Sequence, residues 1–72
     1  MLDELEIDRL KIKAAKATDK SEVLDIIKKL GEYAVSPFRE KAIDAICFII
    51  AGGINLEAKN YALDVIQAMR EI

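Results

Sequence analysis

The chain has 72 residues, with no histidine and a single cysteine. Without histidine there is no imidazole base and no ordinary zinc or haem ligand set. One cysteine can form neither an internal disulfide nor a thiolate cluster, which excludes a disulfide-stapled secreted scaffold. We therefore expect no metal, no cofactor and a reducing, cytoplasmic location.

A basic N-terminus and long apolar runs are also missing. The chain begins MLDELE, which is acidic where a signal peptide would be basic. No apolar run approaches the roughly 20 residues that span a bilayer. The sequence therefore predicts no membrane segment.

What the chain does have is apolar material in one small domain. Residues 1–72 are 53% hydrophobic and 33% charged, with a formal net charge of -2. A domain of this size buries only a little over half of the surface of its unfolded chain, so a small bundle does not easily hide that much apolar surface. The surplus favours a protein partner or self-association, and the alternative is a tight monomer rich in isoleucine and alanine.

The stretch 37–51 predicts a central helix. Ser36 is a good N-cap, Pro37 suits the first helical position, and Gly52 and Gly53 can turn left-handed to end the helix. From position 45 onward every residue of the helix is apolar, so this helix needs cover on more than one side. We expect it to be the most buried of the helices.

The segment from about Leu2 to Ala17 predicts a first helix, with acidic residues in its first turn. A pair of strands about Asp8-Arg9 is the rival interpretation, because short alternating apolar runs flank those residues. The alanine-rich run 14–17 favours the helix. Its expected apolar face is Ile7, Leu10, Ala14 and Ala17, flanked by Leu5.

Two more helices complete the prediction. Asp19, with Glu22 three residues later, is an acidic capping signal for a helix that continues or bends at Gly31 and stops at 35–37. Asn55 is the predicted N-cap of a helix from Leu56 to about Glu71. The expected core-facing residues are Val23, Ile26, Ile27, Leu30 and Ala34 in the earlier helix, and Ala58, Ala62, Val65, Met69 and Ile72 in the later one, with Leu56, Tyr61 and Ile66 at its edges.

Short connections between these helices predict an all-α fold, a compact bundle of four antiparallel helices or a short piece of solenoid. Residues 38–46 place alanines at regular intervals after Arg39 and a proline-containing turn, and a similar spacing recurs at 58–66. This pattern resembles the second-helix signature of HEAT and armadillo-like repeats over residues 21–71. The resemblance implies stacked helical hairpins, with Leu24, Ile27 and Leu30 as first-helix residues. The matching segments lie 20 residues apart, whereas such repeats recur at about 40–47 residues.

No constellation of residues predicts catalysis. Cys47 lies on the least polar turn, which predicts a buried and unreactive thiol. Carboxylate pairs such as Asp3 and Glu6 lie on faces expected to be exposed to solvent, where nothing desolvates them for acid–base catalysis. Gly52-Gly53 is not followed by the lysine and the serine or threonine that a phosphate-binding loop requires. We expect the protein not to be an enzyme.

Residues 9–29 carry a local excess of four positive charges. Arg9, Lys13, Lys16 and Lys20 are the candidate surface for an anionic partner. An acidic pI near 5.0 and the apolar second half of the central helix make nucleic acid the less favoured partner. A solvated helix face that balances the acidic N-terminal residues is the simpler interpretation.

The sequence therefore predicts a non-catalytic helical module for protein–protein interaction. Phe48, Ile50 and Ala51, at the apolar end of the central helix, are its candidate interaction surface. Phe48 either packs in the core or anchors a symmetric homodimer. A small nucleic-acid-binding protein that uses the 9–29 segment is the alternative.

Overall fold

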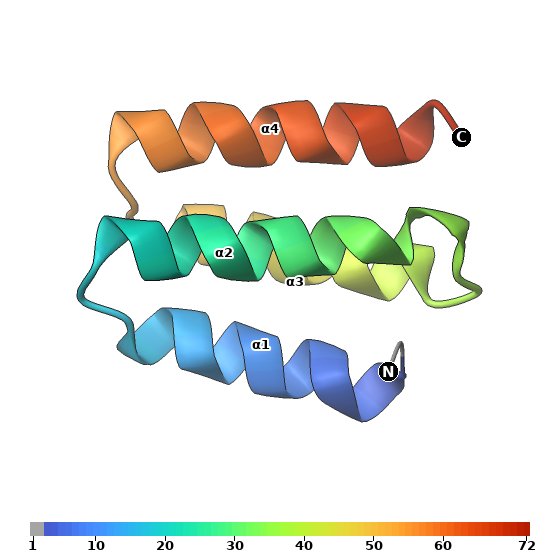
Figure 1. Ribbon diagram of the computed structural model, residues 1–72, viewed down its shortest axis with the longest axis horizontal. Helices are drawn as coiled ribbons and strands as arrows, with labels where there is room; N and C mark the ends of the chain where they lie inside the picture. The colour runs from blue at the N-terminus through green and yellow to red at the C-terminus, as the bar shows by residue number, and fades with distance from the viewer. Residues whose placement is uncertain (1–2) are drawn as a thin grey trace.

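The computed structural model describes residues 3–72, and within them it contains four α-helices and no strand. The α-helices are α1 (Glu4–Lys16), α2 (Lys20–Gly31), α3 (Arg39–Ala51) and α4 (Leu56–Arg70), and a 3-10 turn η1 (Glu32–Val35) extends α2. The predicted all-α bundle of four helices is confirmed (Figure 1). The expected first residue of the first helix, Leu2, lies outside the described residues.

Consecutive helices are antiparallel, so α1 and α3 run in one direction and α2 and α4 in the other (Figure 1). Helix α2 packs against each of the other three helices, and so does α3. Within residues 3–72, α1 and α4 make no contact with each other, because they lie at opposite ends of the longer diagonal of the bundle. The chain thus forms two helical hairpins, α1–α2 and α3–α4, that lie side by side.

Three helices begin with side-chain caps. The Asp3 carboxylate accepts from the Glu6 N–H at 2.7 Å, Asp19 accepts from the Ser21 N–H at 3.2 Å, and Asn55 Oδ1 accepts from the Ala58 N–H at 2.8 Å. Each bond satisfies one of the backbone donors that a helix N-terminus leaves free. The caps predicted at Asp19 and Asn55 are confirmed.

The central helix begins two residues later than expected. The Ser36 hydroxyl accepts from the Phe38 N–H at 3.0 Å, and the Arg39 N–H donates to the Ser36 carbonyl at 3.1 Å. These bonds close a turn that holds Pro37 and Phe38 outside the helix, so the prediction of Ser36 as N-cap was wrong. At the other end Gly52 stays right-handed with φ -74, and Gly53 alone turns left-handed with φ +88.

The second helix ends at Gly31, because the chain tightens there into the 3-10 turn η1. The turn directs the Tyr33 ring into the core, where only 1% of the residue is exposed. The Tyr33 hydroxyl donates to the Asp3 carbonyl at 2.9 Å. One side chain therefore ties the end of α2 to the start of α1, a contact between residues that the sequence pattern did not connect.

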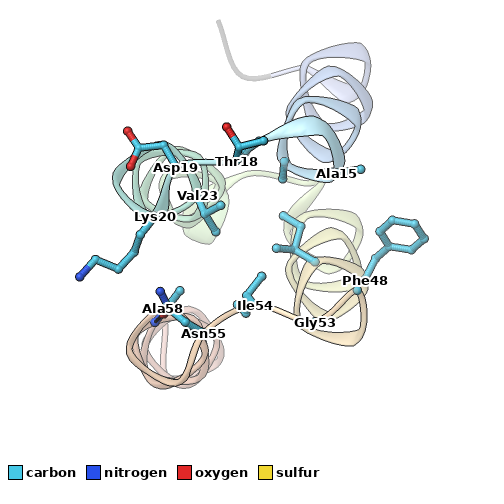
Figure 2. A pocket seen from close by; sticks show the side chains of 14 residues that line it. Ala15, Thr18, Asp19, Lys20, Val23, Phe48, Gly53, Ile54, Asn55 and Ala58 are labelled. Carbon is cyan, nitrogen blue, oxygen red and sulfur yellow. Dashed lines mark hydrogen bonds between the residues drawn. The ribbon is translucent and has the colours of Figure 1, made fainter.

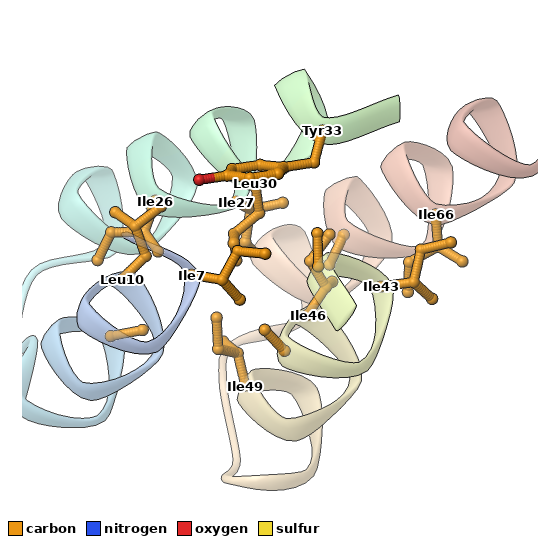
Figure 3. Close-up of a cluster of buried hydrophobic side chains, with 14 of the residues drawn as sticks. Ile7, Leu10, Ile26, Ile27, Leu30, Tyr33, Ile43, Ile46, Ile49 and Ile66 are labelled. Atoms are coloured by element: carbon orange, nitrogen blue, oxygen red, sulfur yellow. The ribbon is translucent and has the colours of Figure 1, made fainter. Parts of the chain in front are cut away.

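The core of the described chain is entirely apolar and lies between the two hairpins (Figure 3). Helix α3 contributes the most buried residues of any helix, as predicted. Leu56 and Ile72 were expected to face the core but are 70% and 69% exposed, because they lie at or beyond the ends of α4. The buried residues are Ile7, Leu10, Ala14, Val23, Ile26, Ile27, Leu30, Tyr33, Ala42, Ile43, Ala45, Ile46, Ile49, Ala58, Ala62, Ile66 and Met69.

Candidate functional site

Phe48 is the large apolar side chain on the exposed side of α3. It is 56% exposed, and its ring points away from the bundle (Figure 2). The Lys11 ammonium of α1 lies 5.1 Å from the ring centroid, close enough for a cation–π contact. This contact holds the ring beside α1 without covering it.

The exposed Ala15 of α1 lines the same pocket as Phe48. Ile12 is 55% exposed, but it is turned by about 100° around α1 from Lys11, so it points to another side. Ala15 and Phe48 form what we call the Phe48 surface. It lies on the side of the bundle formed by α1 and α3.

An ion-pair cluster fixes the polar end of that side. The Lys41 ammonium lies 3.3 Å from a Glu4 carboxylate oxygen and 3.5 Å from one of Asp8. Burial lowers the pKa of Lys41, but the bonds to Glu4 and the charges of both carboxylates outweigh burial, so the pKa is raised overall. Lys41 lies two turns before Phe48 on the same side of α3, so this cluster and Phe48 both lie along the contact between α1 and α3.

The structure brings together two of the three predicted interaction residues. Ala51 is exposed and lies one turn after Phe48, turned from it around α3 toward Cys47. Ile50 is half-buried and packs against the core. Residues two apart differ by about 200° around a helix, so Phe48 and Ile50 point to opposite sides of α3.

The prediction that Cys47 is buried was wrong, since its side chain is exposed. The core-facing side of α3 is taken by Ala42, Ile43, Ala45, Ile46 and Ile49. Cys47 falls outside that arc. The apolar character of its neighbours in sequence gave no information about which side would remain uncovered.

The predicted basic surface is only partly assembled. Arg9, Lys13 and Lys16 are all exposed and, at spacings of four and three, share one face of α1. Lys20 instead bonds to Glu57 of α4 at 2.8 Å. That hydrogen bond and the charge of Glu57 raise the pKa of Lys20, so its charge is already balanced.

A cavity of about 350 Å³ lies at the end of the bundle where the loops 17–19 and 52–55 approach each other (Figure 2). Ala14, Val23 and Ile49 are among its apolar lining residues, and Thr18 and Asn55 are among the polar ones. The sequence pattern did not predict this cavity, which exists because residues from all four helices and both loops meet there. Among residues 3–72 the structure has no cluster of three or more His, Cys, Asp or Glu that could hold a metal.

None of the helices among the described residues combines the length and the apolar character needed to cross a membrane. No protein-family model matches the chain, and comparisons with curated proteins and with solved structures find no match.

Proposed function

We propose that this protein is a non-catalytic helical module that binds another protein through the Phe48 surface, in the cytoplasm. The observation that carries the proposal is the 56% exposure of Phe48, whose ring has the Lys11 ammonium beside it and no side chain over its outer side (Figure 2). An aromatic ring on a rigid helix is the kind of side chain that anchors a protein interface, because it buries a large apolar area at little conformational cost.

The local charges support this assignment. Lys11 lies over one part of the ring, and the Lys41 cluster lies two turns away. An apolar centre with charged groups at its edge is the usual anatomy of a protein–protein interface. The partner expected from this surface presents an apolar cavity for Phe48 and an acidic group within reach of Lys11.

We also propose that the hairpin formed by α2 and α3 is related to HEAT-like repeats. The support is that α2, which holds Leu24, Ile27 and Leu30, and α3, which holds nearly all of the segment 38–46, are consecutive, antiparallel and in contact (Figure 1). Non-catalytic protein binding is the role that such stacked hairpins commonly serve.

The experiment that tests the proposed function compares the parent chain with Phe48→Ser as bait in native extract. We expect the parent to retain a protein at high salt and Phe48→Ser to lose it. Leu56→Ser is the matched control, since Leu56 is 70% exposed but lies on α4, away from the Phe48 surface. If circular dichroism shows both variants folded and Phe48→Ser still retains the protein, the proposal is wrong.

Nucleic-acid binding is the second candidate, carried by Arg9, Lys13 and Lys16 on one exposed face. Three phosphate contacts give a slope of log affinity against log salt of only about -3, which corresponds to weak binding. A mobility shift with duplex and single-stranded nucleic acid, repeated across salt concentrations, tests it. A shift that is lost in Lys13→Glu would favour this function over the protein-binding one.

A further inference from the structure

The side of the second hairpin that faces away from the first hairpin is a separate exposed surface. On α3, Asp44, Cys47 and Ala51 are exposed and, at spacings of three and four, share one face. On α4, Lys59 and Leu63 are exposed four residues apart, and Leu63 is 47% exposed. We call these five residues the outer face.

The contacts of α3 with α1 and of α4 with α2 show which way the outer face points. Phe48 marks the side of α3 next to α1, and Cys47 is turned by about 100° from it, away from α1. On α4, Tyr61 lies in a pocket with Lys28 and Gly31 of α2. Leu63 is turned by about 200° from Tyr61, so it points away from α2.

The corresponding side of the first hairpin has a different character. Arg9, Lys13 and Lys16 of α1, and Asp25 and Lys29 of α2, are all exposed, and Leu5, four residues before Arg9, is an exposed apolar residue among them. In proteins built from stacked hairpins, the unit at the end of a stack has a polar outer side. The first hairpin has a mostly charged side, whereas the centre of the outer face is Cys47, Ala51 and Leu63.

The two charges nearest the centre of the outer face, Asp44 and Lys59, have opposite signs, and the exposed Glu40 and Arg70 lie farther out on the same sides of α3 and α4. Arg39 donates to the Met69 carbonyl at 3.4 Å, which places the start of α3 beside the end of α4. Lys59, one turn into α4, is therefore opposite the last turn of α3. Asp44 lies about one turn to one side of Cys47 along the bundle, and Lys59 lies about half a turn to the other side.

We propose that a second copy of this chain binds the outer face about a two-fold axis that passes near Cys47. Such an axis brings Asp44 of each copy toward Lys59 of the other and packs Cys47 against its equivalent, with Ala51 and Leu63 around this central contact. Neither Asp44 nor Lys59 forms an ion pair within residues 3–72, so both charges are available. A symmetric pair is also the commonest closed arrangement for a homo-oligomer.

Head-to-tail association is the competing arrangement of two copies. It would place the apolar centre of one outer face against the charged side of the first hairpin of the next copy. Burying Arg9, Lys13 and Lys16 against apolar groups costs free energy, because their charges would lose water without gaining partners. The symmetric arrangement avoids this cost. It deepens the proposed function by naming one partner, at a face other than the Phe48 surface.

A charge-exchange series in sedimentation equilibrium tests the pairing. We expect the parent to dimerise, Asp44→Lys and Lys59→Asp each to weaken the dimer by about tenfold, and the double variant Asp44→Lys/Lys59→Asp to restore it. Both positions are exposed, so folding is not at risk in either variant. A parent that stays monomeric at millimolar concentration, or a double variant no tighter than the singles, overturns the proposal.

Disulfide cross-linking through Cys47 tests the position of the two-fold axis, because a disulfide between the two copies needs their Cys47 Cα atoms within about 7 Å of each other. We expect a mild thiol oxidant such as diamide to convert the dimer to a covalent one, and Cys47→Ser to remain a non-covalent dimer. Leu63→Glu should give a folded monomer. Phe48→Glu should stay dimeric.

These outcomes separate the two proposals. A dimer that survives Leu63→Glu but not Phe48→Glu, or that never cross-links through Cys47, overturns the outer-face interface and leaves the Phe48 surface as the contact. Loss of the captured protein in Phe48→Ser with the dimer intact supports both. A dimer that behaves as expected in a chain that captures no protein leaves only self-association.

Discussion

Replacing Gly31 by alanine tests how closely α2 and α4 approach. A Cβ built on Gly31 lies 3.0 Å from Val65 Cγ1 of α4, which is tighter than ordinary van der Waals contact. Alanine is favoured over glycine in a helix by about 1 kcal/mol. Overpacking a well-filled contact costs about 1–3 kcal/mol. The overlap should therefore outweigh the gain, and we expect Gly31→Ala to destabilise the parent by about 1 kcal/mol.

Val65→Ala removes the atom that the new Cβ meets, and so it supplies the second background of a double-mutant cycle. In Val65→Ala we expect Gly31→Ala to stabilise the fold by about 0.5–1 kcal/mol, since only the helix preference remains. Urea unfolding followed by circular dichroism gives both differences. Equal effects of Gly31→Ala in the two backgrounds would show that the Gly31–Val65 contact does not set the helix spacing.

Two further predictions concern single contacts and are checked by thermal unfolding. Tyr33→Phe removes the bond to the Asp3 carbonyl and should cost about 1 kcal/mol, or about 4–8 °C in Tm; an unchanged Tm would mean that the bond contributes nothing. Burial raises the pKa of Tyr33 above 10.0, so its contribution is complete below that pH and is lost as pH rises through the folded-state pKa; the parent should lose stability more steeply than Tyr33→Phe above pH 10.0. Asn55→Ala removes the α4 cap and should cost about 1 kcal/mol, whereas Asn60→Ala, at an exposed interior position of α4, should not destabilise.

The candidate sites were only partly predictable. The apolar run at the end of α3 indicated an uncovered surface, and Phe48 and Ala51 are exposed there. The pattern could not tell which side of that run would face the core. Every residue in the run is apolar, so the pattern has no polar stripe from which to read an orientation. Ile50 and Cys47 were therefore assigned to the wrong sides.

The partners of charged residues were equally hidden in the sequence. Lys20 belongs to the basic segment by position, but its ammonium bonds to Glu57, 37 residues later. The outer face depends in the same way on the pairing of α3 with α4. No local pattern encodes a contact of this range, because it depends on how the helices pack.

The sequence by itself determined the helices and most of their ends. Apolar residues at helical spacing, with Asp19 and Asn55 as caps, are local features whose physics acts within one or two turns. Only the tertiary structure decided where α2 gives way to a 3-10 turn, since that change accompanies the burial of Tyr33 against the start of α1. It also decided which side of α3 stays exposed, because three other helices cover a helix that is apolar all round and leave one side open.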